Sequence, residues 1–171
     1  MPTTVTGSPQ PMDSEPVPLT DADGFRDALM QLLRDARRQL RIYSQELARE
    51  LYSDPAVVQG LSDFARSSRY AHIQILITDS DPVLRRPHRL IPLVQRLGSR
   101  IELKKIQPST EPSDWEFALA DREQVIQRSD TSKWIGSYHL QNAVRVRQLQ
   151  DVFEQAWVHA RPDPELKRLL L

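Results

Sequence analysis

The sequence predicts an α/β fold whose mixed, mostly parallel sheet is flanked by helices on both faces. Strand-like and amphipathic segments alternate through residues 22–106 and form two β-α-β units, and parallel neighbours need such helical connections. Two shorter strand-like segments then follow one another across a tight turn, which is typical of an antiparallel hairpin. A long amphipathic segment after the hairpin predicts a closing helix.

The length and composition indicate a single domain from a reducing compartment. A chain of 171 residues has room for one domain, and the absence of cysteine excludes thiol chemistry and disulfides. The chain lacks a signal peptide and a span of roughly 20 apolar residues, so we expect a cytoplasmic protein without membrane contact. Its 23 basic and 23 acidic residues cancel, so an electrostatic partner must recognise a local patch.

Residues 1–19 are expected to form a disordered, Pro-rich tail. They hold five of the 13 prolines and have no apolar period, so they cannot bury enough surface to offset the chain entropy of ordering. We expect the α/β domain over residues 20–160. A short helix or a tail is expected over residues 161–171.

The first three elements of the domain have clear boundary signals. Asp21 and Asp23 are both N-cap candidates for a helix over 22–38, whose apolar residues recur at helical spacing. Apolar and polar residues alternate over 39–44, which predicts a strand. An Asp-Pro pair then opens a helix over 54–67, because Asp is a good N-cap and Pro suits the first helical position.

The second β-α-β unit follows. Residues 72–78 are β-branched and apolar and end in turn residues, so we expect a central buried strand there. Apolar residues at helical spacing predict a helix over 88–97 that stops at Gly98, and alternation returns over 100–106.

The last third of the domain is expected to add antiparallel strands. Residues 115–120 and 124–128 read as two strands joined by a tight turn. A further strand is expected over 133–138. The closing helix is expected over 142–159, where apolar residues recur at helical spacing.

This order of elements resembles a single half of the phospholipase D-like fold, over roughly residues 24–160. The pieces that carry the resemblance are Arg41-Ile-Tyr-Ser44, Ile73-Gln-Ile-Leu-Ile77, Phe117-Ala-Leu-Ala-Asp121 and the helix from Asn142 through Phe153 to Trp157. The resemblance implies a homodimer, because active single-half members of that superfamily bring two motifs together across one site.

Members of that superfamily carry a His-x-Lys-x4-Asp motif on this hairpin strand, in which His attacks phosphorus, Lys neutralises the phosphate and Asp orients the His. Placing the family's Asp at Asp121 puts Glu116 at the Lys position and Asp114 at the His position. A carboxylate is a poor nucleophile toward a phosphodiester, and Glu116 would repel the phosphate. We therefore expect no catalytic residue and interpret Asp114, Glu116 and Asp121 as a degenerate site. The structural alternative for Asp121 is a cap on the hairpin turn.

Residues 85–105 contain seven basic residues and one acidic residue, Glu102. Three of these basic residues and one histidine lie at the N-terminal end of the predicted helix and form a candidate phosphate site, since helix N-termini favour anions: Arg85, Arg86, His88 and Arg89. The alternative is a solvated helix face and a protected strand edge. Tyr43 and Gln45 are further ligand-binding candidates, because the carboxyl ends of parallel strands border the crevice where ligands bind.

These observations lead to one function and two alternatives. The first is a catalytically inactive phospholipase D-like domain, a pseudoenzyme that binds or regulates a protein partner or a phosphate-bearing ligand. The second is a nucleic-acid-binding protein that uses the basic segment from Arg85 to Lys105. The third is a hydrolase that uses carboxylates. We expect no cofactor and no metal, since the four histidines have neither metal-ligand spacing nor a Lys two positions on.

Overall fold

The computed structural model describes residues 15–106, 115–161 and 163–171. In this part of the chain one sheet contains seven strands in the order β1-β7-β6-β5-β2-β3-β4. The strands are β1 (Val17–Leu19), β2 (Gln39–Ser44), β3 (His72–Ile77), β4 (Ile101–Lys105), β5 (Glu116–Ala120), β6 (Gln124–Arg128) and β7 (Gly136–His139). The helices are α1 (Ala22–Asp35), α2 (Arg49–Tyr52), α3 (Pro55–Arg66), α4 (Asp81–Arg85), α5 (Leu90–Arg96), α6 (Ala143–His159) and α7 (Pro164–Leu170).

The sheet has a parallel half and an antiparallel half. β2, β3 and β4 are parallel, and α3 and α5 lie in their two crossover connections, which confirms the two predicted β-α-β units. β5, β6, β7 and β1 are antiparallel, and β5 joins the halves by pairing antiparallel with β2. The expectation of a mostly parallel sheet is therefore too strong, because β7 and β1 extend the hairpin and antiparallel pairings outnumber parallel ones.

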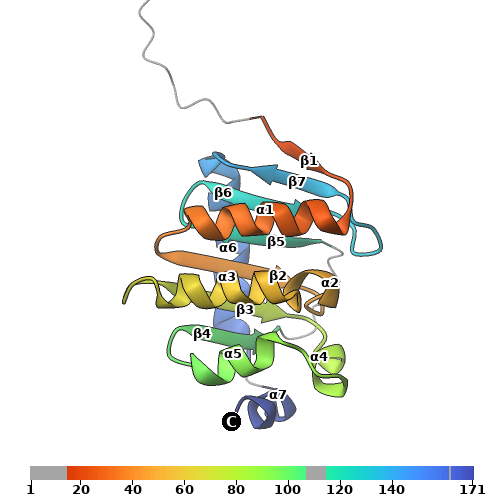
Figure 1. The fold of residues 1–171 in the computed structure, drawn as a ribbon, viewed down its shortest axis with the longest axis vertical. Coiled ribbons are helices and arrows are strands. Elements are labelled where there is room, and N and C mark those ends of the chain that lie inside the picture. The colour runs from red at the N-terminus through yellow and green to blue at the C-terminus, as the bar shows by residue number, and fades with distance from the viewer. Residues whose placement is uncertain (1–14, 107–114, 162) are drawn as a thin grey trace, which may run out of the picture.

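Helices cover both faces of the sheet, as predicted. Figure 1 shows α1, α3 and α5 side by side on one face, while α6 crosses the strands on the other face. Alternation along β2 sends Leu40 and Ile42 into the larger core beneath α1 and α3. It sends Tyr43 to the smaller core, where Phe117 of β5 packs against Phe153 of α6. Arg41 shares the α6 face with Tyr43, and its side chain reaches Glu154 of that helix.

Two predicted N-caps form, and Asn142, which was predicted only as the start of the closing helix, is a third cap. Asp21 accepts from the Gly24 backbone N–H at 2.6 Å, so Asp21 and not Asp23 begins α1. Asp54 accepts from two backbone N–H groups at the start of α3, at 2.9 and 3.2 Å. Asn142 accepts from the N–H of Arg145 at 3.0 Å and begins α6. Each cap satisfies N–H groups that have no partner within the helix.

The structure corrects the N-terminal boundary of the ordered domain. Val17–Leu19 were predicted to belong to the tail, but they form β1, because β7 offers an unpaired edge and Leu19 enters the core. Residues 1–14 of the predicted tail lie outside the described residues. α1 ends at Asp35 and not at residue 38, since the backbone N–H groups of residues 37–39 donate to a side chain instead of continuing the helix.

Shorter elements were not predicted, and one boundary moved. α2 and α4 span four and five residues, too few for an apolar period to be visible in the sequence. The helix expected from residue 88 begins at Leu90 as α5. α7 begins at the N-cap Asp163 and packs beside α5. Across the described residues, every helix is too short or too polar to cross a membrane.

Candidate functional site

Glu116 lies where β2 ends and β5 begins, at a place that we call the motif end of the sheet (Ser44, Gln45, Glu116 and Arg128). Glu116 is the first residue of β5, and its side chain is buried on the α1 face. Its Oε1 accepts from the Ser44 hydroxyl at 3.1 Å and from the Gln45 backbone N–H at 2.9 Å. Glu116 is therefore held by the end of the neighbouring strand.

Arg128 completes this arrangement from the opposite strand of the hairpin. Its Nη1 lies 3.4 Å from Glu116 Oε2. Its Nε and Nη2 each donate at 2.7 Å, to the carbonyls of Lys133 and Thr131. Its guanidinium carbon lies 3.9 Å from the ring centroid of Trp134. Arg128 thus contacts a carboxylate, two carbonyls and an aromatic ring, and it compensates the charge of Glu116 within the protein.

The surroundings of this pair are apolar and closed. Burial raises the pKa of Tyr52, and the charge of Glu116 raises it further, so that phenol stays neutral at any physiological pH. Ser44 Oγ also accepts from the Leu47 backbone N–H at 3.0 Å, which fixes the hydroxyl toward Glu116. The pair resembles a structural ion pair more than a ligand site, because its polar atoms already have partners.

The two candidates on or after β2 lie in different places. Gln45 belongs to the motif end, where its Oε1 accepts from the Thr78 hydroxyl at 2.7 Å. Tyr43 is buried beneath α6, with its ring stacked on Phe117 at 5.0 Å and on Trp115 at 5.8 Å. Tyr43 therefore contributes to the core and does not line an open crevice.

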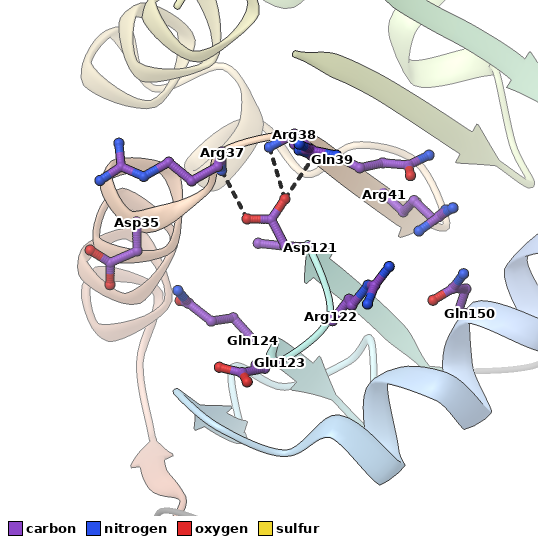
Figure 2. Close-up of a pocket in the computed structure, with 11 residues that line it drawn as sticks. Asp35, Arg37, Arg38, Gln39, Arg41, Asp121, Arg122, Glu123, Gln124 and Gln150 are labelled. Carbon is purple, nitrogen blue, oxygen red and sulfur yellow. Dashed lines mark hydrogen bonds between the residues drawn. The ribbon is translucent and has the colours of Figure 1, made fainter. Parts of the chain in front are cut away.

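Asp121 lies at the other end of β5, which we call the turn end of the sheet. Its two carboxylate oxygens accept from the backbone N–H groups of Arg37, Arg38 and Gln39 at 2.8, 2.9 and 3.0 Å (Figure 2). Its own φ is 51°, a left-handed conformation that Asp tolerates better than most residues. Asp121 thus ties the hairpin turn to the loop that precedes β2.

The three degenerate-site positions do not meet in the part of the chain that the structure describes. Glu116 and Asp121 lie at opposite ends of the same strand, and Asp114 lies outside the described residues. No three His, Asp or Glu side chains of the described residues are grouped so that they could hold a metal ion. A hydrolase built on paired carboxylates gains no support from Glu116 and Asp121.

The four candidate phosphate ligands of the basic segment have different surroundings and partners. Arg85 and Arg86 are exposed where α4 ends, and Arg85 pairs with Asp81 at 3.5 Å. Arg89 donates from Nη1 to the Ser53 carbonyl at 3.0 Å. His88 points inward, because α5 begins only at Leu90 and the preceding residues pack against the loop after β2.

The ring of His88 bridges two backbone segments. Its Nδ1 accepts from the Leu90 N–H at 3.1 Å, which leaves Nε2 to donate to the Leu47 carbonyl at 3.0 Å. Burial lowers the pKa of His88, the hydrogen bond to Leu47 opposes this, and the charge of Arg49 lowers the pKa further. His88 therefore has a structural role as a neutral ring.

Other cations of the basic segment hold elements together. Arg100 donates from Nη1 to the carbonyls of Ala65, in the last turn of α3, and of Ser68, just after it, at 2.7 and 2.8 Å. Lys104 lies 4.3 Å from the ring centroid of Trp157, and Lys105 lies 3.5 Å from Asp163. The basic residues that cluster in the sequence thus have separate partners in the structure.

A pocket of about 680 Å³ lies at the turn end, beside Asp121 (Figure 2). The residues that line it are Asp35, Arg37, Arg38, Gln39, Arg41, Ala120, Asp121, Arg122, Glu123, Gln124 and Gln150. Sequence reasoning did not identify it. No signal in the sequence pointed to Arg41, because its surroundings depend on where α6 lies. Arg128 could have been found, since a hairpin that turns at residues 121–123 pairs it with Glu116.

A family model described as "Domain of unknown function (DUF7931)" matches residues 21–169. The chain belongs to this family. No curated protein is significantly similar in sequence to the DUF7931 chain.

Solved structures share the fold of the DUF7931 domain at low identity. NucT from Helicobacter pylori aligns with a TM-score of 0.65 at 10% identity, over 87% of this chain and 99% of NucT. Nuc from Salmonella typhimurium, a phospholipase D family member, aligns with a TM-score of 0.62 at 14% identity, over 86% and 97% of the two chains. These likenesses confirm the phospholipase D-like fold, and at such identities they show the fold alone.

A third structure is the archaeal chromatin protein TrmBL2, which shows a novel mode of DNA binding. It aligns with a TM-score of 0.60 at 11% identity, over 86% of the DUF7931 chain. The chain spans about half of TrmBL2, 54% of its length. The same fold is thus found in a phospholipase D family member and in a DNA-binding chromatin protein.

Proposed function

We propose that this protein is a phospholipase D-like domain without phosphodiesterase activity, and that it acts as a binding or regulatory module. The observation that carries the proposal is the buried contact of Glu116 with Arg128. The superfamily places a lysine where Glu116 lies, and that lysine must be available to a phosphate. Glu116 has the opposite charge, and its carboxylate is already neutralised by Arg128.

Electrostatics and access both support this proposal. A phosphodiester brought to the motif end would approach a carboxylate and would have to displace Arg128 from Glu116, from two carbonyls and from Trp134. Each of these contacts would be lost before the guanidinium could turn to a ligand. Phosphoryl chemistry depends on cations that are preorganised toward the developing charge, and Arg128 is oriented toward Glu116 instead.

The direct test is hydrolysis of bis(p-nitrophenyl) phosphate and of plasmid DNA by the purified protein. We expect no turnover above the buffer rate, with or without Mg²⁺. Asp114→Asn and Glu116→Gln serve as matched variants, because each removes one motif-position charge with little change of shape. Turnover by the wild type that is lost in folded Asp114→Asn would overturn the proposal, since it would identify an active site that depends on the motif.

Nucleic-acid binding is a second candidate, and the shared fold of TrmBL2 favours it. Arg85, Arg86 and Arg96 are exposed and lie on the basic segment. If they contact phosphates, the affinity for a 20-base-pair duplex falls with rising salt, and replacing all three by Gln reduces the slope of log affinity against log salt by roughly three. A slope that the triple variant leaves unchanged would remove this candidate.

A further inference from the structure

Arg41 is a buried cation whose charge is only partly compensated. It lies in the middle of β2, and its side chain is 10% exposed. Its Nη2 lies 3.4 Å from Glu154, a long contact with a side chain that is 53% exposed. Its Nε has no hydrogen-bond partner among the described residues. A buried donor without a partner is destabilising, and a ligand that accepted a hydrogen bond from it would relieve this cost.

The guanidinium of Arg41 lines the turn-end pocket, where other polar groups converge with it. Figure 2 shows the ends of Arg41, Arg122 and Gln150 gathered on one side of the pocket. They come from three separate elements, β2, the hairpin turn and α6. Arg122 is exposed, and no ion pair within the described residues engages its guanidinium. Two cations and an amide thus face one space from different directions.

The carboxylates of the pocket compensate these cations incompletely. Asp121 is occupied by three backbone N–H groups, and Asp35 accepts from Gln31 at 3.0 Å. Four arginines line the pocket against three carboxylates. Burial lowers the pKa of Arg41, while Glu154 opposes that effect, so an anion in the pocket would stabilise the charged guanidinium.

We propose that the turn-end pocket binds the phosphate group of a small molecule, with Arg41 and Arg122 as its cationic ligands. A guanidinium offers Nε and Nη as a parallel pair of donors that matches two oxygens of one phosphate. The Nε of Arg41 is buried and has no partner among the described residues, so it could join that pairing once the guanidinium turns toward the phosphate. A second guanidinium from the hairpin turn favours a doubly charged group over a single carboxylate, and Gln150 adds an amide donor.

The shape of the surface favours a small molecule over a flat partner. The pocket is a concavity of about 680 Å³, a size typical of small-molecule sites. A second pocket, of about 390 Å³, shares Arg122, Glu123 and Gln150 with the first and continues along α6 past Arg147. The phosphate would lie beside Arg41, and the rest of the ligand would extend over this second pocket.

The site lies at the opposite end of β5 from Glu116, so this inference goes beyond the proposed function and does not depend on it. Phosphodiesterase turnover tests the motif end. Phosphate binding tests the turn end. Either proposal can be overturned without affecting the other, because the phosphodiesterase test and the phosphate-binding test use variants at different residues.

The test is titration of the full chain with inorganic phosphate and, as a chemical control, with acetate. Binding is followed by the shift in melting temperature and by the ¹H–¹⁵N signal of the Arg41 Nε–H group, which is assigned by its loss in Arg41→Met. We expect phosphate to raise the melting temperature and to move this signal, and acetate to do neither at equal ionic strength. Adenosine monophosphate and a twelve-base DNA strand are further probes, and we expect the monophosphate to bind more tightly than the strand.

Three variants test the residues. Arg122→Gln is exposed and should fold normally, and it should weaken phosphate binding about tenfold, as expected for one lost charged hydrogen bond. Arg41→Met should abolish the phosphate-dependent shift. Arg168→Gln is the matched control, because it removes one exposed arginine on α7, and it should leave binding unchanged.

Several outcomes would overturn the proposal. They include no response of the wild type to phosphate, an equal response to acetate, and equal weakening in Arg168→Gln and Arg122→Gln. Tighter binding of the DNA strand than of the monophosphate would also overturn it, by assigning the pocket to nucleic acid. If Arg41→Met does not fold, the phosphate-dependent shifts in melting temperature of the wild type and of Arg122→Gln still test the proposal.

Discussion

Glu116 and Arg128 face one another across the β5–β6 hairpin, and each side chain is only 8% exposed. An ion pair this deeply buried contributes little net stability when it is intact, but breaking one side leaves an unpaired charge in the core. Arg128→Met should therefore lower the free energy of unfolding by about 3–5 kcal/mol. Urea unfolding followed by circular dichroism measures the change.

The matched control for that prediction is the double variant Glu116→Gln with Arg128→Met. Removing both charges should recover a large part of the lost stability, because no ion is left unpaired. Equal stability of the single and double variants would show that the pair is not coupled in the way that its geometry indicates.

Asp121→Ala should loosen the connection between the hairpin turn and the start of β2. Three backbone N–H groups lose a charged acceptor, and alanine tolerates the φ of 51° less well than aspartate. We expect a loss of about 1–3 kcal/mol, and a smaller loss in Asp121→Asn, which keeps one acceptor oxygen. Hydrogen exchange should accelerate at the amides of residues 37–39, and unchanged protection there would contradict the prediction.

Gly136→Ala should prevent β7 from pairing in its present register. A Cβ at this position would lie 1.8 Å from the Gln127 carbonyl oxygen and 2.8 Å from Phe25, so the strand would have to move. We expect a loss of more than about 3 kcal/mol, as for severe overpacking. Gly98→Ala is the control, because a Cβ there meets its nearest atom at 3.5 Å. Similar melting temperatures for the two variants would contradict this.

His88 should make the protein less stable at mildly acidic pH. Its folded-state pKa is lowered by burial, so the unfolded chain binds the proton more readily than the folded protein does. The stabilisation is complete above the unfolded-state pKa of about 6.5 and is lost as the pH falls through the folded-state pKa. His88→Gln should show a shallower decline of melting temperature between neutral pH and that lower pKa. The same dependence of melting temperature on pH in the wild type and in His88→Gln would contradict a neutral, buried ring.

Local signals predicted most of the fold. Asp21 and Asp54 act as N-caps within their own helices, so their neighbours in sequence were enough to identify them. β2 and β6 have their predicted bounds, because apolar alternation and turn residues lie within each segment. β1 escaped prediction because its three residues become a strand only beside β7, which lies far along the chain.

The candidate site was harder to predict because it depends on tertiary contacts. The sequence located Glu116 and Asp121, and the hairpin register could have paired Arg128 with Glu116. It could not show that the Gln45 backbone also binds Glu116 or that residues 37–39 bind Asp121. The cluster of basic residues around Arg85 suggested one surface, whereas packing turned His88 inward and gave Arg89 a backbone partner. Arg41 looked like an ordinary strand residue, and its burial follows from the path of α6, which covers this face of the sheet.

The position of β1 also bears on how the chain folds during its own synthesis. Leu19 leaves the ribosome early, but its partner Gly136 in β7 is made only after the whole parallel half of the sheet. A ribosome adds roughly 5–20 residues per second, so β1 waits for seconds while the parallel β-α-β units can already form. β1 is translated before the other six strands of the described sheet but is therefore among the last to join it, and a pause in translation before β7 would leave β1 unpaired and the edge of β6 open.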